Sequence, residues 1–200
     1  MKFLGRMTAT IALLFLSRAW QGLKVDLEAI YAEYCNTVRS KVPAIVIKAL
    51  ILAEDRRFSK HGGIDPIAIG RAVWNFIVHR KLEGGSTIEQ QLIRKVTGQY
   101  KRQFYRKMRE ILIASLVERV IPKYDIPGVY LSIAYFGWRM NGFQQACHRL
   151  GIDLSNITPP HAASIVARLK YPQPKVVSDI RARQIAVREK HILNLLSREN

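Results

Sequence analysis

Hydrophobic and polar residues follow one another along the chain mostly with the spacing of α-helices. The apolar run at residues 45–53 predicts a buried helix, and Pro43 is suited to its first turn. Asp65 followed by Pro66 is a typical helix start, with Asp as the N-cap and Pro at the first helical position. A second helix is therefore expected through residue 78.

Further helices are expected in the rest of the chain. Ser86 and Glu89 have the spacing of a capping box, so a helix that begins there would satisfy its own first amides. Gly98 is expected to end it, and the next helix runs from 101 to 121, where Pro122 stops it. Shorter helices are expected at 127–135, 142–150, 159–169 and 178–196, the last two capped by Thr158 and Ser178. Since no convincing pair of strands is present, the pattern predicts a mainly α fold.

The N-terminal segment has the outline of an export or anchoring signal. Lys2 and Arg6 precede an apolar run at residues 7–16. A full membrane span needs about 20 apolar residues, so residues 1–23 are predicted to form a short uncleaved anchor with its positive end inside. Cleavage after this segment, or an apolar helix that is buried or lies in the membrane interface, are the alternatives. Residues 24–41 are expected to be a linker, and residues 42–200 one domain.

Charge narrows the class of partner. The 200 residues include 32 Lys and Arg against 15 Asp and Glu, and the net charge of +17 predicts a polyanionic partner: a nucleic acid, an anionic membrane or a phosphorylated substrate. The aromatic-and-basic signature of a common nucleic-acid module is missing from the sequence. Cys35 and Cys147 lack the spacing of a metal motif, and whether they pair stays open.

The first candidate for chemistry is Glu54, at the end of the apolar helix. A half-desolvated carboxylate flanked by Arg56, Arg57 and Lys60 has the chemistry of a general base that neighbouring cations keep ionised. The alternative is an ordinary charged helix terminus.

A second candidate site combines a glycine pair with a row of charges. Gly84 and Gly85 precede a helix start, where free N–H groups and the helix dipole favour an anion. Arg102, Arg106 and Glu110 follow at four-residue steps, which places two guanidinium groups and a carboxylate on one helix face. The functional interpretation is a second catalytic carboxylate beside a phosphate clamp, and the alternative is a solvated, salt-bridged face.

Four stretches, in order, match the motifs of one family. The first is matched by Glu54, Asp55, Phe58, His61 and Gly63, and the second by Gly84, Gly85, Ser86, Thr87, Ile88, Gln90 and Gln91. The third is matched by Arg106, Lys107 and Glu110, and the fourth by Tyr130 and Leu131 with Tyr135-Phe136-Gly137 behind them. The chain thus resembles the peptidoglycan glycosyltransferases, which include the transglycosylase domain of bifunctional penicillin-binding proteins and monofunctional relatives. The resemblance covers about residues 42–172.

This resemblance implies a lysozyme-like, mainly helical lobe with a smaller membrane-facing lobe. It implies an inverting enzyme that polymerises lipid II, an undecaprenyl-diphosphate-linked disaccharide-peptide, at the outer, periplasmic face of the cytoplasmic (inner) membrane. The expected partners are lipid II, the growing glycan strand and the anionic membrane, with other cell-wall synthesis proteins as further candidates, and no nucleic acid. A divalent cation, Mg²⁺ or Mn²⁺, is a candidate cofactor, and no organic cofactor is expected.

The resemblance also implies roles for single residues. Glu54 would take the proton from the acceptor sugar's 4-hydroxyl, and Glu110 would sit near the diphosphate, where it organises cations or a divalent metal. The diphosphate would be held by Arg94, Arg102, Arg106 and Lys107. The other substrate-binding residues would be Asp55, Ser86, Thr87, Gln90, Gln91 and Ser132.

This chain departs from the family pattern at four places. Glu89 stands where the family usually has Thr, and Arg94-Lys95 stands where it usually has Lys-Asn, which keeps the cation. Ser132 replaces the usual Asn, and the later Leu-Pro segment reads Leu169-Lys170-Tyr171-Pro172. Both carboxylates are retained, so an enzyme is predicted. Two alternatives stay open: a glycan-cleaving enzyme of the lysozyme type, which also needs two carboxylates, and a basic binding module for anionic lipid or nucleic acid.

Overall fold

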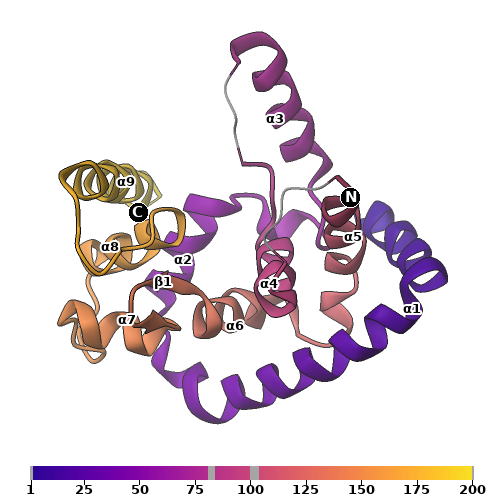
Figure 1. The fold of residues 1–200 in the computed structure, drawn as a ribbon, viewed down its shortest axis with the longest axis horizontal. Helices are drawn as coiled ribbons and strands as arrows, with labels where there is room; N and C mark the ends of the chain where they lie inside the picture. Colours follow the sequence, from indigo (N-terminus) through magenta and orange to yellow (C-terminus); the bar gives the residue numbers. More distant parts are fainter. Residues whose placement is uncertain (1, 81–83, 100–103, 200) are drawn as a thin grey trace. The chain divides into compact units, whose positions relative to one another are not determined.

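The fold of this chain is almost entirely helical, as the hydrophobic pattern predicts (Figure 1). A computed structural model describes residues 2–80, 84–99 and 104–199. The chain divides into two compact units: the first combines Met1–Tyr31 with Glu54–Ile126, and the second combines Ala32–Ala53 with Pro127–Asn200. The prediction of a mainly α fold is confirmed.

A long helix, α1 (Lys2–Glu33), begins the first unit. It bends at Leu16, whose φ of −125° and ψ of 19° are not helical. Residues 24–41, expected as a linker, are helical, because α1 continues to Glu33 and is followed by the turns Tyr34–Val38 and Arg39–Lys41. Among the described residues, no helix has the length and hydropathy needed to cross a membrane.

The candidate motifs of the first unit lie on three helices and in the segments before and between them. The helices are α3 (Pro66–His79), α4 (Ile88–Thr97) and α5 (Phe104–Ala114), and the 3₁₀ turns are Phe58–Lys60, Val117–Arg119 and Lys123–Asp125. Helices α4 and α5 pack against each other, with Leu92 and Ile113 among their buried residues. Helix α5 is shorter than expected, since the helix ends at Ala114, and residues 101–103 of the predicted helix lie outside the described residues.

Local capping explains where two of these helices begin. Asp65 caps α3 as predicted, and its Oδ1 accepts from the amide of Ile67 at 3.0 Å. The predicted capping box of Ser86 and Glu89 is wrong. Thr87 is the N-cap of α4, and its hydroxyl accepts from the amide of Gln90 at 3.3 Å.

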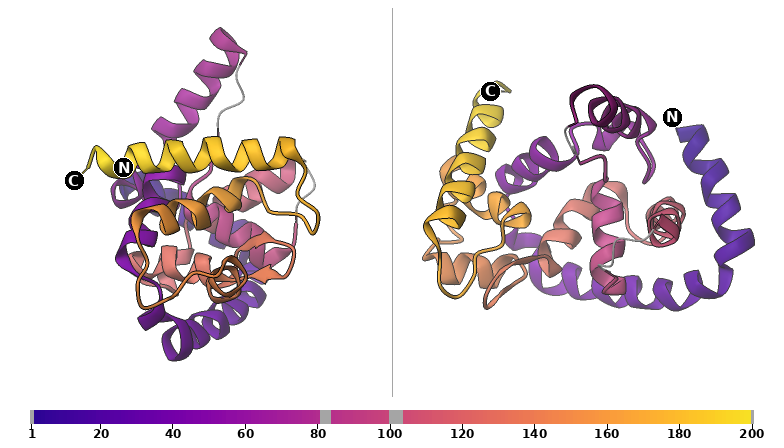
Figure 2. Two further views of the ribbon diagram at one scale, coloured as in Figure 1. Left: turned by 90° about the vertical axis from the view of Figure 1, so that its left-hand side faces the viewer. Right: turned by 45° about the horizontal axis from the view of Figure 1, so that its top comes forward.

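The second unit contains five helices and one small sheet among its described residues. They are α2 (Ala44–Glu54), α6 (Ile126–Ile133), α7 (Phe143–Leu150), α8 (Pro159–Lys170), α9 (Asp179–Ser197) and the strands β1 (Tyr135–Gly137) and β2 (Met140–Asn141). The last residue of α2, Glu54, and the first of α6, Ile126, belong to the first unit. Helices α8 and α9 lie side by side (Figure 2).

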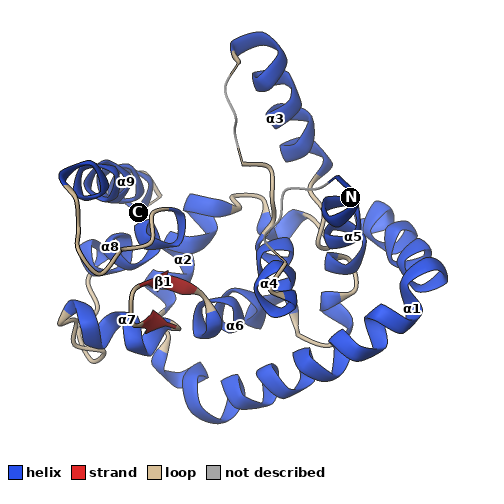
Figure 3. Cartoon of the chain, in the orientation of Figure 1, coloured by secondary structure: helices blue, strands red, loops and turns tan. Residues whose placement is uncertain are grey.

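The expectation that the chain has no strand pair is wrong. The two strands, β1 and β2, are drawn in red in Figure 3. They are antiparallel, with Tyr135 opposite Asn141 and Gly137 opposite Met140. Gln173 extends this pairing, because its backbone donates to Phe136 O at 3.0 Å and accepts from the Trp138 amide at 2.8 Å. The strands are only three and two residues long, too short for an alternating pattern to mark them.

Candidate active site

Glu54 and Asp55 are neighbours in sequence with different surroundings. Glu54 ends α2 and is half-buried, and the side-chain amide of Gln91 on α4 donates to its Oε2 at 3.2 Å. Asp55 is buried, its Oδ1 lies 3.0 Å from His61 Nε2, and its Oδ2 accepts from the Ile88 amide at 3.2 Å. A carboxylate at the first amides of a helix is favourable. Asp55 therefore holds α4 in place, while Glu54 keeps part of its surface exposed.

The start of α4 is also joined to the loop that follows Glu54. The hydroxyl of Thr87 donates to the carbonyl of Gly63 at 2.8 Å, and the side-chain amide Nε2 of Gln90 donates to the same oxygen at 3.4 Å. Gly63 has a φ of +81°, and a Cβ there would lie 2.3 Å from the carbonyl oxygen of Ala114. Only glycine fits this approach to Ala114. The first two motifs come together through side-chain donors of the second, Thr87 and Gln90, and the backbone carbonyl of Gly63 in the first.

Three cations surround the carboxylate of Glu110. Arg94 makes a bidentate contact, with Nε 3.0 Å from Oε2 and Nη2 2.8 Å from Oε1. Arg106 donates to Oε2 at 2.5 Å and Lys107 to Oε1 at 2.7 Å. Arg106 and Glu110, which the sequence places four positions apart, thus form an ion pair. Lys107 from α5 and Arg94 from α4 bind the same carboxylate.

This cluster, Arg94, Arg106, Lys107 and Glu110, keeps an excess of positive charge. Burial raises the pKa of Glu110, but hydrogen bonds from Arg94 and Lys107 outweigh burial, so the pKa is lowered and the carboxylate stays ionised. Burial lowers the pKa of Lys107, and contact with Glu110 opposes that effect. Three cations against one carboxylate suit an additional anion.

Ser86 and Gln90 extend the cluster toward the start of α4. The ammonium of Lys107 donates to Ser86 Oγ at 2.9 Å and to Gln90 Oε1 at 2.6 Å, and Arg94 Nη2 lies 3.5 Å from Ser86 Oγ. These contacts explain why Ser86 does not cap the helix, since its hydroxyl oxygen accepts hydrogen bonds from Lys107 and Arg94 instead.

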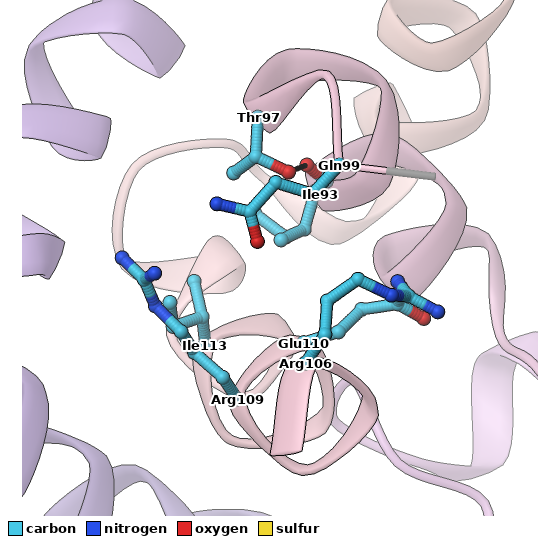
Figure 4. Close-up of a pocket in the computed structure, with 7 residues that line it drawn as sticks. All are labelled: Ile93, Thr97, Gln99, Arg106, Arg109, Glu110 and Ile113. Carbon is cyan, nitrogen blue, oxygen red and sulfur yellow. Dashed lines mark hydrogen bonds and ion pairs between the residues drawn. The ribbon is translucent and has the colours of Figure 1, made fainter. Parts of the chain in front are cut away.

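A small pocket of about 10 Å³ lies beside this cluster. Figure 4 shows Arg106 next to Glu110, while Arg109 points to the other side of α5. The other lining residues are Ile93, Thr97, Gln99 and Ile113. The space is about that of one water molecule, so it is no substrate site in itself.

Glu89 points into the interior, away from the cluster. Its fully buried carboxylate binds the ammonium of Lys123, which also donates to the carbonyl of His61 at 2.8 Å. Burial raises the pKa of Glu89, although Lys123 and His61 oppose that rise. The carboxylate that stands where the family usually has Thr is therefore turned away from the Glu110 cluster.

Neither the group of Asp55, His61 and Glu89 nor the carboxylate of Glu110 is arranged as a metal site. Asp55, His61 and Glu89 offer ligand atoms within 4.8 Å of one another, but the Lys123 ammonium already supplies a cation to Glu89. Both oxygens of Glu110 accept hydrogen bonds from cations, and a divalent ion would lie among three positive charges. The expected divalent cation thus does not fit Glu110 as a direct ligand, and the predicted requirement stays a prediction.

The third and second motifs thus meet on α5 and α4. A model of the transglycosylase family matches residues 26–197. The chain belongs to the transglycosylase family. The predicted resemblance is confirmed.

Several penicillin-binding proteins are similar to this transglycosylase chain. Penicillin-binding protein 1F of Bacillus subtilis is 35% identical over 150 residues, which are 74% of this chain and 21% of that protein. Penicillin-binding protein 1A of Aquifex aeolicus is 37% identical over 134 residues, 66% of this chain and 18% of that protein. Penicillin-binding protein 1A/1B of Bacillus subtilis is 36% identical over 135 residues, 66% of this chain and 15% of that protein. The chain therefore spans about a fifth or less of the length of these relatives.

Most of the predicted site residues of this transglycosylase chain lie in the first unit. Glu54 contacts Gln91, and Asp55 contacts the start of α4. The group around Glu110 contains Ser86, Gln90, Arg94, Arg106 and Lys107. Thr87 is a helix cap, which gives it a structural role.

Two predicted site residues are not among those described in the first unit. Ser132 belongs to the second unit, where its hydroxyl donates to Val129 O at 2.8 Å. Arg102 lies outside the described residues. The sequence interpretation also missed Lys123, because nothing local marks a lysine that binds a carboxylate 34 positions away.

Proposed function

We propose that this chain is a peptidoglycan glycosyltransferase that polymerises lipid II into glycan strands. The observation that supports it most is the Glu110 cluster, which lies inside the region matched by the transglycosylase family. The net charge of +17 agrees with a substrate and a membrane that are both anionic.

In the proposed reaction, the Glu110 cluster stabilises the leaving group. The bond from the donor's anomeric carbon to a diphosphate oxygen breaks, and the diphosphate leaves with the electron pair. Arg94, Arg106 and Lys107 stabilise the charge that develops on it, since fixed cations act most strongly on charge formed in the transition state. Glu110 holds these cations in position and keeps them from repelling one another.

Glu54 is proposed as the base on the acceptor side. The oxygen of the acceptor's 4-hydroxyl forms a bond to the anomeric carbon while Glu54 takes the hydroxyl proton. Attack opposite the leaving group inverts that carbon. The contact from Gln91 orients Glu54 Oε2, and its half-exposed position keeps the carboxylate open to substrate.

We place the protein at the outer face of the cytoplasmic membrane, with α3 as its membrane-facing lobe. Trp74 and Ile77 are 64% and 65% exposed on α3, and Phe76 and Val78 are also exposed. A helix with exposed aromatic and aliphatic side chains suits the boundary between lipid and water. Arg71 and Arg80 on or next to it suit anionic headgroups.

The test is polymerisation of purified lipid II by the full chain in detergent, with and without Mg²⁺ or Mn²⁺. The wild type is expected to make glycan polymer, and Glu54→Gln is expected to lose at least about a hundredfold in rate. Glu28→Gln is the matched control, because Glu28 is exposed on α1 and pairs only with Lys24 at 3.5 Å in the described part of the chain. Both variants should keep the wild-type unfolding temperature.

Other outcomes identify the alternatives. Digestion of finished peptidoglycan without polymerisation would indicate a glycan-cleaving enzyme. Binding to anionic vesicles that falls steeply with salt and is unchanged in Glu54→Gln, without catalysis, would indicate a basic binding module.

A further inference from the structure

Three cations converge on one tryptophan in the second unit. The guanidinium carbons of Arg139 and Arg149 lie 4.5 Å and 4.4 Å from the Trp138 ring centre, and Lys175 Nζ lies 5.5 Å from it. The three come from the β1–β2 turn, the last turn of α7 and the segment that follows α8. Contacts of this kind are favourable, but they do not cancel the repulsion among three like charges.

No carboxylate balances these cations among the residues that the structure describes. Arg139, Arg149 and Lys175 are exposed and make no ion pair there with Asp or Glu. This differs from the Glu110 cluster, where a carboxylate holds the cations. The group of three cations around Trp138 thus carries a positive charge that no described carboxylate pairs with.

The backbone at Arg139 is strained. Its φ of +57° lies in the left-handed region that glycine or asparagine normally occupies. The backbone of the neighbouring Trp138 is held in place, since its amide donates to Gln173 O at 2.8 Å. Strained positions of this kind concentrate at functional sites. Here the residue with the strained backbone carries the guanidinium group that lies 4.5 Å from the indole ring centre.

We propose that Arg139, Arg149 and Lys175 form a binding site at Trp138 for a phosphate group with two negative charges, either a phosphomonoester or a diphosphate. A guanidinium that stacks on an aromatic ring keeps its N–H groups in the ring-parallel plane, where they can grip phosphate oxygens. Contact with the ring also orders the two arginine side chains before the ligand arrives, which lowers the entropy loss on binding.

Charge selects this ligand over others. A single carboxylate brings one negative charge to three cations, whereas a phosphate dianion brings two charges and three acceptor oxygens. A second copy of the chain is disfavoured, because each copy carries a net charge of +17. The phosphate could belong to a lipid headgroup or to a soluble molecule, and the experiment separates these sources.

The indole N–H of Trp138 provides a local signal for the test. The chain has only three tryptophans, so ¹⁵N-tryptophan labelling of the full chain yields three indole signals, and Trp138→Phe assigns the relevant one. Inorganic diphosphate is titrated in one arm. In the other arm, vesicles of phosphatidylcholine with or without phosphatidic acid are added. Binding to the vesicles is measured by the loss of the free-protein indole signals and by sedimentation of the protein with the vesicles.

Saturable movement of the Trp138 signal by diphosphate is expected, with Trp20 and Trp74 signals unmoved. Arg139→Gly should weaken binding about tenfold without unfolding the protein, because glycine suits the φ of +57°. Lys190→Gln is the matched control, since it removes one exposed charge from α9 in the same unit. Because the readout needs no catalysis, it is independent of the proposed glycosyltransferase activity.

Each outcome is decisive. A diphosphate response without vesicle binding assigns the site to a soluble phosphate, and Arg139-dependent binding only to phosphatidic acid vesicles assigns it to a lipid headgroup. The proposal is overturned if neither probe affects the Trp138 signal, if Lys190→Gln weakens binding as much as Arg139→Gly, or if a hexaglutamate peptide binds as tightly as diphosphate.

Discussion

Lys123 binds Glu89 in the interior of the first unit. The same ammonium donates to the His61 carbonyl at 2.8 Å and lies 4.0 Å from the centre of the Phe58 ring. It thereby ties α4, which carries Gln91 and Arg94, to the loop that follows Glu54. The buried pair holds two parts of the candidate active site together without touching the proposed substrate.

Replacing Lys123 should destabilise the protein strongly. Lys123→Met leaves the buried carboxylate of Glu89 without its cation, and breaking such a pair costs about 3–5 kcal/mol. The free energy of unfolding, measured by denaturant titration, should fall accordingly, and Glu89→Gln/Lys123→Met should recover at least half of the loss. Lys24→Met, which removes only the exposed pair with Glu28, should cost less than about 1 kcal/mol. Equal effects of the two lysine substitutions would contradict this account of the pair.

Two buried glutamates should make stability depend on pH in opposite directions. The folded-state pKa of Glu110 is lowered below the usual 4.5, because its cations outweigh burial, so its contribution is present above pH 4.5 and lost as pH falls through the folded pKa. Burial raises the folded-state pKa of Glu89, so its contribution is present below pH 4.5 and lost as pH rises through the folded pKa.

Denaturant titrations at several pH values can measure this contrast. The difference in unfolding free energy between the wild type and Glu110→Gln should shrink on acidification. The difference between the wild type and Glu89→Gln should shrink as the pH rises from 4.5. If both differences in unfolding free energy shrink on acidification, or both shrink as the pH rises, the pKa of one of the two carboxylates is shifted in the direction opposite to that expected.

Adjacent hydroxyls at the start of α4 should have separable effects. Thr87→Val removes the N-cap and the bond to Gly63 O, and should lower the unfolding free energy by about 1–2 kcal/mol. Ser86→Ala should change stability by less than about 0.5 kcal/mol. It should nevertheless slow lipid II polymerisation on the order of tenfold, because Lys107 and Arg94 lose an acceptor. The original capping-box prediction would require the larger stability loss at Ser86.

The two glycines of the loop after Glu54 should differ sharply. Gly63→Ala places a Cβ 2.3 Å from Ala114 O at a φ of +81°, and should cost about 2–4 kcal/mol. Gly62→Ala places a Cβ 3.6 Å from Glu118 Oε1, an ordinary contact, and should cost about 1 kcal/mol or less. The thermal unfolding temperatures of the two variants provide the comparison, and similar values would rule out the close approach at Gly63.

Local sequence signals predicted much of the secondary structure. Asp65 and Ser178 cap α3 and α9 as expected, and Gly98 ends α4 with a φ of +62°. Such signals work because a cap bonds to amides two or three residues away. The short sheet was missed because its strands are only three and two residues long, too short for an alternating pattern to mark them.

The sequence by itself determined the family, the mainly helical fold and the two carboxylates, Glu54 and Glu110, because motif spacing and helical periodicity are local properties of the chain. Only the tertiary structure decided that Thr87, and not Ser86, caps α4, that Glu89 turns inward to Lys123, and that Arg94 joins Arg106 and Lys107 around Glu110. A buried charge takes the partner that packing brings within reach, and that partner can stand anywhere in the sequence.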